Sequence, residues 1–298
     1  MILQQLQKEI KQLKALASRE PDVKKQAELM KQYHTKALEF LELVSADEKS
    51  RAGMTGLELR EYIKTLPKVP KYEVGISAFD EFLGGFETGL FINLAAESGA
   101  GKTTTVLDIV TNIAKGRKSV FFSFEMGKKL LNSKLYKMEV SDKQLENLIL
   151  DFENSDLDDL VREIELYAYE GIKFFGIDSK MKISVKGNDP EHLKISKISS
   201  TLSKLCAKKD IIIFLINQIS EDDMKSKRLS LKGSGDQKYD ADLLFFLTID
   251  KDEKRWLHCT KNRMSDILFK TEITKRNNAP VVYEFKGDDN IKIDMPCI

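Results

Sequence analysis

The chain has 298 residues, 42% of them hydrophobic, and its 48 basic and 47 acidic side chains nearly cancel to a formal net charge of +1. This composition supports a sizeable core in one large domain with a small addition, or in two domains, and it excludes a uniformly basic surface. No run of about 18 apolar residues is present, so we expect no membrane span. The first residues lack the apolar core of a secretory signal, and the three cysteines have neither disulfide nor zinc spacing. We therefore expect a cytoplasmic protein.

Two amphipathic helices are predicted at the start of the chain. Apolar side chains recur three or four positions apart over residues 2–19 and again up to about residue 44, with Pro21 between the two stretches. Two helices joined by such a short turn form an antiparallel hairpin. Its apolar stripe must be covered either by the protein's own core or by a neighbouring subunit, and the pattern leaves both alternatives open.

A short helix and a proline-containing segment end this N-terminal region. Residues 45–56 are polar and contain glycine, which predicts a loop, and residues 57–66 follow as a short helix. Pro67 and Pro70 restrict the backbone, so a helix cannot continue through them. We place a boundary here, between a helical arm with its linker helix at 1–66 and a larger domain at 67–298.

Apolar runs alternate with helical patterns from residue 72 onward. The runs that we expect to be strands lie at 90–95, 119–125, 172–178, 211–218 and 243–249. Continuous apolar runs are typical of strands buried on both faces, and their alternation with helices predicts an α/β fold with a mostly parallel sheet. Shorter strands at 256–260 and 281–285, separated by polar turns, predict hairpins at the C-terminal edge of the sheet.

The first of these strands leads into a loop of small residues and then a helix. The loop and helix start read Ala96-Glu97-Ser98-Gly99-Ala100-Gly101-Lys102-Thr103-Thr104. Backbone N–H groups in such a loop and at a helix N-terminus cradle phosphate oxygens. Lys102 adds a positive charge at the β- and γ-phosphates, and the Thr103 hydroxyl is placed to bind Mg²⁺. The whole segment therefore predicts an ATP-binding phosphate loop, with Ala96 as the small residue where the pattern usually has glycine.

Three further polar side chains end predicted strands, where an open α/β sheet gathers its ligand groups. Asp178 is expected to hold Mg²⁺, although an aspartate also ends many ordinary strands. Glu125 is expected to orient and deprotonate the attacking water, and the alternative is a cap on the following helix. Gln218 is expected to contact the γ-phosphate or the water, unless it serves only its own loop.

Two basic segments lie further along the chain. Arg228 and Lys232, with Gly233 and Gly235, belong to a loop without an aromatic side chain before Tyr239, which favours contacts with a nucleic-acid backbone and no sequence preference. The alternative is a solvated basic loop.

The second segment, Lys261-Asn262-Arg263, places two cations one residue apart in a predicted hairpin. Such cations are expected to reach a γ-phosphate bound by a second copy, so that the arginine acts in trans as an arginine finger. The alternative is an ordinary basic pair on the surface.

Taken in order, these motifs resemble the C-terminal ATPase domain of DnaB-type replicative helicases, which are RecA-like, phosphate-loop hexameric ATPases. Residues 74–86 are similar to the segment that leads into that family's core, Phe122-Ser123-Phe124-Glu125-Met126 is similar to its Ser-Leu-Glu-Met, and Ala at the first loop position is normal there. The resemblance implies that Glu125 is the catalytic glutamate, Asp178 the Walker B aspartate and Gln218 the γ-phosphate sensor. It also implies that residues 231–235, shortly before Asp240-Ala241-Asp242, form the central DNA-binding loop, and that Lys261 and Arg263 act in trans.

The departures from the family pattern are local. Ser179-Lys180-Met181 follows Asp178 where the family often has Tyr-Leu-Gln, and Lys232-Gly233 stands where Arg-Glu is common. The N-terminal arm is shorter than the family's primase-interacting domain, which indicates a minimal, phage-like form and leaves a primase or loader partner open.

The function implied by this resemblance is an ATP-hydrolysing, ring-shaped helicase or translocase on single-stranded DNA in replication. It would work as a homo-oligomer, expected to be a hexamer, with ATP and Mg²⁺ as its cofactors. The alternative is a RecA-like, nucleotide-gated DNA-binding protein of recombination, or a helicase accessory factor, that does not unwind DNA.

Overall fold

The computed structural model describes residues 2–48, 53–65, 71–96, 99–219, 240–275 and 283–285. The chain divides into two compact units, one of Met1–Lys68 with Arg162–Glu170 and one of Val69–Val161 with Gly171–Ile298. The boundary expected between residues 66 and 67 lies outside the described residues and stays a prediction. Within the described part of the chain, no helix is both long enough and apolar enough to cross a membrane.

The first unit contains the predicted hairpin of α1 (Ile2–Ala17) and α2 (Val23–Glu48), followed by α3 (Gly56–Thr65). The turn before α2 is closed by Asp22, whose carboxylate accepts the backbone N–H groups of Lys24 and Lys25 at 2.9 and 3.2 Å. Such a cap satisfies donors that the first turn of a helix cannot pair internally, so Asp22 begins the second helix where the sequence predicts it.

The apolar stripe of the hairpin is covered by the same chain. Leu6, Ile10, Tyr33 and Ala37 are buried together with Leu166, which belongs to the helical segment 162–170 of this unit. Glu170 of the same segment adds two polar contacts with the hairpin. The Tyr33 hydroxyl donates a hydrogen bond to Glu170, and the Lys14 ammonium pairs with the same carboxylate at 2.7 Å. Of the two alternatives that the sequence left open, the structure therefore shows packing within the chain.

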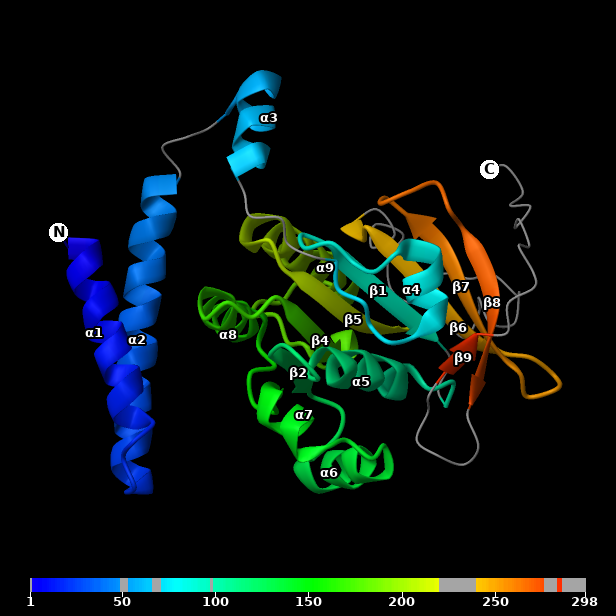
Figure 1. The fold of residues 1–298 in the computed structure, drawn as a ribbon, viewed down its shortest axis with the longest axis horizontal. Coiled ribbons are helices and arrows are strands. Elements are labelled where there is room, and N and C mark those ends of the chain that lie inside the picture. Colours follow the sequence, from blue (N-terminus) through cyan, green and yellow to red (C-terminus); the bar gives the residue numbers. More distant parts are fainter. Residues whose placement is uncertain are drawn as a thin grey trace. The chain divides into compact units, whose positions relative to one another are not determined.

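The second unit is built on a nine-stranded sheet of order β3-β2-β4-β5-β1-β6-β7-β8-β9 (Figure 1). Neighbouring strands from β3 to β6 are parallel, and those from β6 to β9 are antiparallel. The strands are β1 (Phe91–Ala96), β2 (Ser119–Ser123), β3 (Leu148–Asp151), β4 (Phe174–Asp178), β5 (Ile212–Gln218), β6 (Leu243–Ile249), β7 (Arg255–Asn262), β8 (Phe269–Lys275) and β9 (Tyr283–Phe285). The predicted α/β fold with a mostly parallel sheet and antiparallel C-terminal strands is confirmed.

Two strands were not predicted, and each has a local reason. β3 is four residues long at the sheet edge, too short to stand out as an apolar run. β8 carries polar side chains such as Lys270 and Glu272 between its apolar ones. Because β8 lies between β7 and β9, the two predicted C-terminal strands do not pair with each other.

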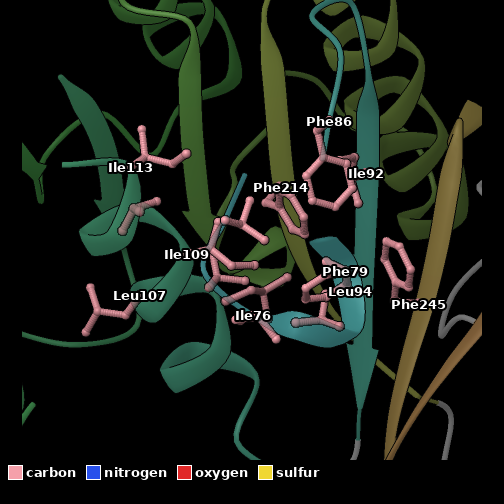
Figure 2. Close-up of a cluster of buried hydrophobic side chains, with 14 of the residues drawn as sticks. Ile76, Phe79, Phe86, Ile92, Leu94, Leu107, Ile109, Ile113, Phe214 and Phe245 are labelled. Carbon is pink, nitrogen blue, oxygen red and sulfur yellow. The ribbon is translucent and has the colours of Figure 1, made fainter. Parts of the chain in front are cut away.

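Helices cover the sheet. They are α4 (Ser77–Leu83), α5 (Lys102–Ile113), α6 (Lys128–Lys137), α7 (Asp142–Asn147) and α9 (Glu191–Lys209), with a 3₁₀ turn at Lys180–Lys182. A further helix, α8 (Leu157–Tyr169), begins in this unit and continues in the first. Side chains of α4 and α5 form the core against one face of the sheet, where the Phe79 ring meets the edge of Phe245 at a centroid distance of 4.9 Å (Figure 2). A Cβ atom added at Gly176 of β4 would lie 2.8 Å from Val106 of α5. Glycine at this position therefore lets α5 approach the sheet closely and fixes the helix at whose start the phosphate loop ends.

Candidate active site

The predicted phosphate loop lies between β1 and α5. β1 ends at Ala96, α5 begins at Lys102, and Gly99 and Gly101 have positive φ angles of 82° and 101°. Side chains with a Cβ rarely adopt this backbone, so glycine is needed for the chain to turn into the helix. The Lys102 ammonium donates to the Ala96 carbonyl at 3.0 Å and so folds back over the loop.

The other loop residues complete this turn. Ala100 is buried, and Thr104 is half-buried in the first turn of α5. Glu97 and Ser98 lie outside the described residues. The loop and helix start thus have the form that a phosphate-binding role requires, and the nucleotide-binding role itself stays a prediction.

Thr103 and Asp178 meet directly. The Thr103 hydroxyl donates to one Asp178 carboxylate oxygen at 2.7 Å, although the two residues lie 75 positions apart in the chain. Asp178 ends β4 and is fully buried, and its other carboxylate oxygen, Oδ1, has no hydrogen-bond partner among the described residues. A buried acceptor without a donor is costly, and a cation would satisfy it. The residues present therefore fit the Mg²⁺ that the sequence predicts at Thr103 and Asp178.

The electrostatics of Asp178 agree with this fit. Burial raises the pKa of its carboxyl to about 6, the Thr103 hydrogen bond acts in the opposite direction, and the nearby Glu125 carboxylate raises the pKa further. Lys102 lowers it by its positive charge. Two carboxylates and Lys102 thus share one small region, and burial makes the negative charge of Asp178 costly there.

Glu125 comes to this region through the pairing of β2 with β4. Ser123, the last residue of β2, lies opposite Asp178, and the Phe124 N–H donates to the Asp178 carbonyl at 2.7 Å. The predicted strand 119–125 is therefore two residues too long, because this bond ends the ladder and the chain turns at Phe124. Glu125 does not cap the next helix, since the N-cap of α6 is Gly127 and receives no side-chain hydrogen bond.

Gln218 lies at the same edge of the sheet. It is the last residue of β5, is half-buried, and pairs in register with Ala96 at the start of the loop. The segment that follows contains the predicted DNA contacts, and Arg228, Lys232, Gly233 and Gly235 lie outside the described residues. The structure thus gathers Gln218, Glu125 and Asp178 around the loop, as predicted from their positions at strand ends.

Lys261 and Arg263 lie at the opposite edge. β7 runs antiparallel to β6, so Asn262 pairs with Leu243, and Leu243 in turn lies beside Ile92 at the start of β1. β1 has six residues, which separates this edge from the loop by about 17 Å at about 3.3 Å per residue. The structure therefore does not bring these two cations to the phosphate loop of their own chain.

Two features of the site had been missed. Asn217 of β5 donates a side-chain hydrogen bond to Asn93 of β1, and both amides are fully buried beside the residues that lead into the loop. Lys134 of α6 is half-buried, and this burial lowers the pKa of its ammonium. The negative charge of nearby Asp178 acts in the opposite direction. The signal for Asn93 was a polar residue inside the apolar run 91–96, whereas nothing in the local sequence marks Lys134.

Comparisons with known proteins agree with this geometry. Residues 72–172 match the family described as the DnaB-like helicase C-terminal domain. The chain is 27% identical over 212 residues to the replicative DNA helicase DnaB of Treponema pallidum, covering 60% of this chain and 48% of that protein. It is 27% identical over 221 residues to a probable plasmid replicative DNA helicase of Chlamydia psittaci, covering 63% and 47% respectively. The chain thus spans about half the length of these curated relatives.

A third relative comes from recombination. The DNA repair and recombination protein RadB of Methanococcoides burtonii is 30% identical over 161 residues, covering 50% of this chain and 70% of RadB. Among solved structures, one described as an ATPase domain aligns with a TM-score of 0.64 at 20% identity, covering 76% of this chain and 95% of that one. A DnaB-like replicative helicase studied with primase aligns with a TM-score of 0.65 at 18% identity, covering 87% and 77%. The chain therefore has the RecA-like fold and carries, over residues 72–172, a DnaB-like helicase C-terminal domain.

Proposed function

We propose that this chain is the ATP-hydrolysing motor of a ring-shaped helicase that moves along single-stranded DNA during replication. One observation carries the proposal: the phosphate loop, Asp178 and Glu125 converge at one edge of the sheet, while Lys261 and Arg263 lie at the opposite edge. A complete site for phosphoryl transfer then needs two copies, each supplying one half. The names of two relatives, both replicative helicases, support the same function.

In this mechanism the loop 96–104 holds the phosphates of ATP through backbone N–H groups and Lys102. Thr103 and Asp178 would hold Mg²⁺, which when bound neutralises charge on the β- and γ-phosphates. Glu125 accepts a proton from the attacking water and orients it on the γ-phosphate. Arg263 and Lys261 of the adjacent copy stabilise the charge that develops in the transition state.

Gln218 is placed to transmit the state of this site. It ends β5 beside Ala96, and the chain continues from it into the segment that holds Lys232 and Arg228. Loss of the γ-phosphate would remove a hydrogen-bond partner of the Gln218 amide and so shift the start of that segment. ATP turnover would thereby be coupled to the contacts with the DNA backbone.

Exposed apolar side chains support assembly into a ring. α3 has no buried residue, and its Leu57, Leu59, Tyr62 and Ile63 are all exposed to solvent. In the second unit, α6 and α7 line a cavity of about 540 Å³ whose wall includes the exposed Tyr136. We propose that α3 of one copy docks in this cavity of the next, its acidic residues facing the lysines of α6.

Strand displacement on a forked duplex tests the proposal. The full chain should separate the fork with ATP and Mg²⁺, and should do so as a particle several times the size of the 34.0 kDa chain by light scattering. The Lys102→Ala chain is the matched control and should assemble without displacing a strand. A monomer that hydrolyses ATP at the same rate at all protein concentrations would contradict the proposal.

The RadB relative favours a second candidate, a nucleotide-gated DNA-binding protein of recombination. RadB, described as a DNA repair and recombination protein, is the most completely covered of the three relatives, at 70% of its length. This candidate predicts binding to single-stranded DNA that depends on ATP, with no displacement on the fork. The same fork assay, run beside a filter-binding assay, therefore separates the two functions.

A further inference from the structure

Asp242 joins the trans-acting half of the chain to the strand that carries the phosphate loop. Its Oδ1 atom pairs with Nη1 of Arg263 at 3.0 Å, and its Oδ2 atom accepts the Phe91 N–H at 2.9 Å. Its backbone repeats both contacts. The Asp242 N–H donates to the Phe91 carbonyl at 2.8 Å, and the Asp242 carbonyl accepts the Arg263 N–H at 3.0 Å. One residue is thus bonded twice to the start of β1 and twice to Arg263.

The two members of the ion pair differ in exposure. The Asp242 side chain is 19% exposed, whereas the Arg263 side chain is 54% exposed. The carboxylate is therefore anchored by its two bonded oxygens, and the guanidinium extends from it towards solvent. Because a guanidinium is planar and rigid, a bond to one of its nitrogens orients the whole group.

We infer that Asp242 is the positioning residue of Arg263, holding the guanidinium of one copy in the orientation that meets phosphate groups bound by the next copy. The inference rests on the proposed function, because it requires Arg263 to act in trans. The groups recognised are the terminal phosphates of a nucleoside triphosphate. Asp242 itself touches no reacting atom, since it lies at the edge of the sheet away from its own phosphate loop.

A purely structural role explains the arrangement less well. Partly exposed ion pairs contribute little to stability, so an Asp242–Arg263 pair that only stabilised the fold would be of small value. The backbone hydrogen bonds from Asp242 to Phe91 and Arg263 hold the strands together without the carboxylate. Besides its own bond to the Phe91 N–H, the carboxylate adds a fixed direction for the guanidinium, and prior fixation of a charged group accelerates phosphoryl transfer.

Asp242→Asn keeps an oxygen for the Phe91 N–H and removes the charge that holds Arg263. We expect kcat for ATP to fall by about 10-fold to 100-fold, the size of effect that a small misplacement produces, with KM for ATP changed by less than about 2-fold. Asp242→Glu retains the charge and should recover part of kcat. Asp250→Asn is the control, because Asp250 also accepts backbone N–H groups at the far end of β6 but has no contact with Arg263. It should leave kcat unchanged.

Mixed assemblies then show which copy needs Asp242. A mixture of Lys102→Ala and Arg263→Ala chains has complete sites only where Arg263 of the first chain meets the phosphate loop of the second. Placing Asp242→Asn in the Lys102→Ala chain puts the change beside the Arg263 that acts. Placing it in the Arg263→Ala chain puts the change beside the β1 strand whose loop binds ATP.

The inference predicts that the first placement lowers the recovered ATPase rate by about 10-fold or more and that the second leaves it within about 2-fold. Equal losses in both placements would show a folding defect and overturn the inference, as would a loss confined to the second placement or no loss in either. Failure of the parent mixture to recover any activity would instead overturn the trans arrangement of the proposed function. The parent mixture therefore tests the proposed function, and the two placements of Asp242→Asn test the positioning role of Asp242.

Discussion

The two edges of the central sheet differ in how their charges are balanced. At the carboxyl edge, Asp178 is fully buried, and its Oδ1 atom has no donor among the described residues. At the amino edge, Asp242 has a partner on each carboxylate oxygen, and the pair that it forms with Arg263 extends into solvent. The carboxyl edge thus keeps a buried acceptor that a cation would satisfy. At the amino edge both carboxylate oxygens of Asp242 are bonded, and the guanidinium of Arg263 is partly exposed.

This difference teaches how one chain can hold two halves of a site without closing either. Phosphoryl transfer needs charge-stabilising groups on both sides of the transferred phosphate. Six residues of β1 separate the two edges, so the halves of one chain cannot meet across their own sheet. In the proposed mechanism a second copy brings an amino edge to a carboxyl edge, which would tie the reaction to assembly.

The largest effect is expected at the amino edge. Arg263→Ala should lower ATP hydrolysis by about 10³-fold, because an arginine supplied in trans contributes at least this much to phosphoryl transfer. The Kd for ATP should change little, since the phosphate loop of the other edge is intact. A coupled-enzyme ATPase assay and nucleotide titration measure the two quantities. Arg263→Lys keeps the charge and loses the planar fork, and it should recover only part of the rate.

Two results with Arg263→Ala would contradict the assignment of ATP binding to the carboxyl edge and of transition-state stabilisation to the amino edge. If the Arg263→Ala chain kept its rate, or lost ATP affinity and rate in proportion, the arginine would have no separate role in the transition state. Recovery on mixing with the Lys102→Ala chain is the positive counterpart, because neither chain alone contains both halves.

The next largest effect belongs to the carboxyl edge. Glu125→Gln should lower kcat by at least about 10²-fold, since removal of a general base costs that much, while ATP binding is retained. Single-turnover hydrolysis and equilibrium binding separate chemistry from binding. Glu153→Gln serves as the control, because Glu153 is exposed and pairs only with the exposed Lys128 among the described residues. Unchanged turnover in Glu125→Gln would remove Glu125 from the mechanism.

Sequence and structure agree best where the information is local. The strand, the loop of small residues and the helix start could be predicted because they follow one another directly in the chain, whereas phosphate binding by this loop stays a prediction. Asp178 and Gln218 could be predicted because parallel strands end at one edge, so their last residues meet without any knowledge of the strand order. Glu125 was placed correctly for the same reason, although its strand ends two residues earlier.

The contacts that were not foreseen depend on register or on distant segments. Asp242 meets Arg263 because an antiparallel ladder with a bulge between Leu244 and Phe245 sets the pairing of β6 with β7, and no local pattern encodes that register. Tyr33 and Glu170 lie 137 positions apart, and only the folded chain shows which surface covers the N-terminal hairpin. The amphipathic pattern predicts that a stripe is buried but does not name its partner.

A smaller effect is expected in the stability of the carboxyl edge. Burial raises the pKa of Asp178 from 3.8 to about 6, so the folded chain holds this proton more tightly than the unfolded chain does. The unfolding free energy should therefore fall as pH rises from about 4 to about 6, by about 3 kcal/mol for this group. Asp178→Asn removes this loss and should be more stable than the parent at pH 7 by a similar amount, without nucleotide.

Urea unfolding between pH 4 and pH 7.5 measures the difference. Asp108 contributes with the same sign, since burial raises its pKa to about 7, and adding Asp108→Asn to Asp178→Asn should further reduce the loss of stability with rising pH. A stability difference between the parent and Asp178→Asn that stays constant over this range would contradict the cost of the buried charge assigned to Asp178.

The smallest effect is expected in the binding of single-stranded DNA by the segment that follows the carboxyl edge. Lys232 follows Gln218 in the segment that leaves the carboxyl edge, and it lies outside the described residues. Lys232→Ala should reduce the slope of log affinity against log salt on single-stranded DNA by about 0.7, the value for one backbone phosphate contact. Lys25→Ala, an exposed lysine of α2, should leave the slope unchanged. Because the slope counts contacts independently of sequence, an unchanged value on both homopolymer and mixed strands would remove Lys232 from the DNA path. The proposed coupling of ATP turnover to DNA contacts would then need a route other than Gln218 and the segment that follows it.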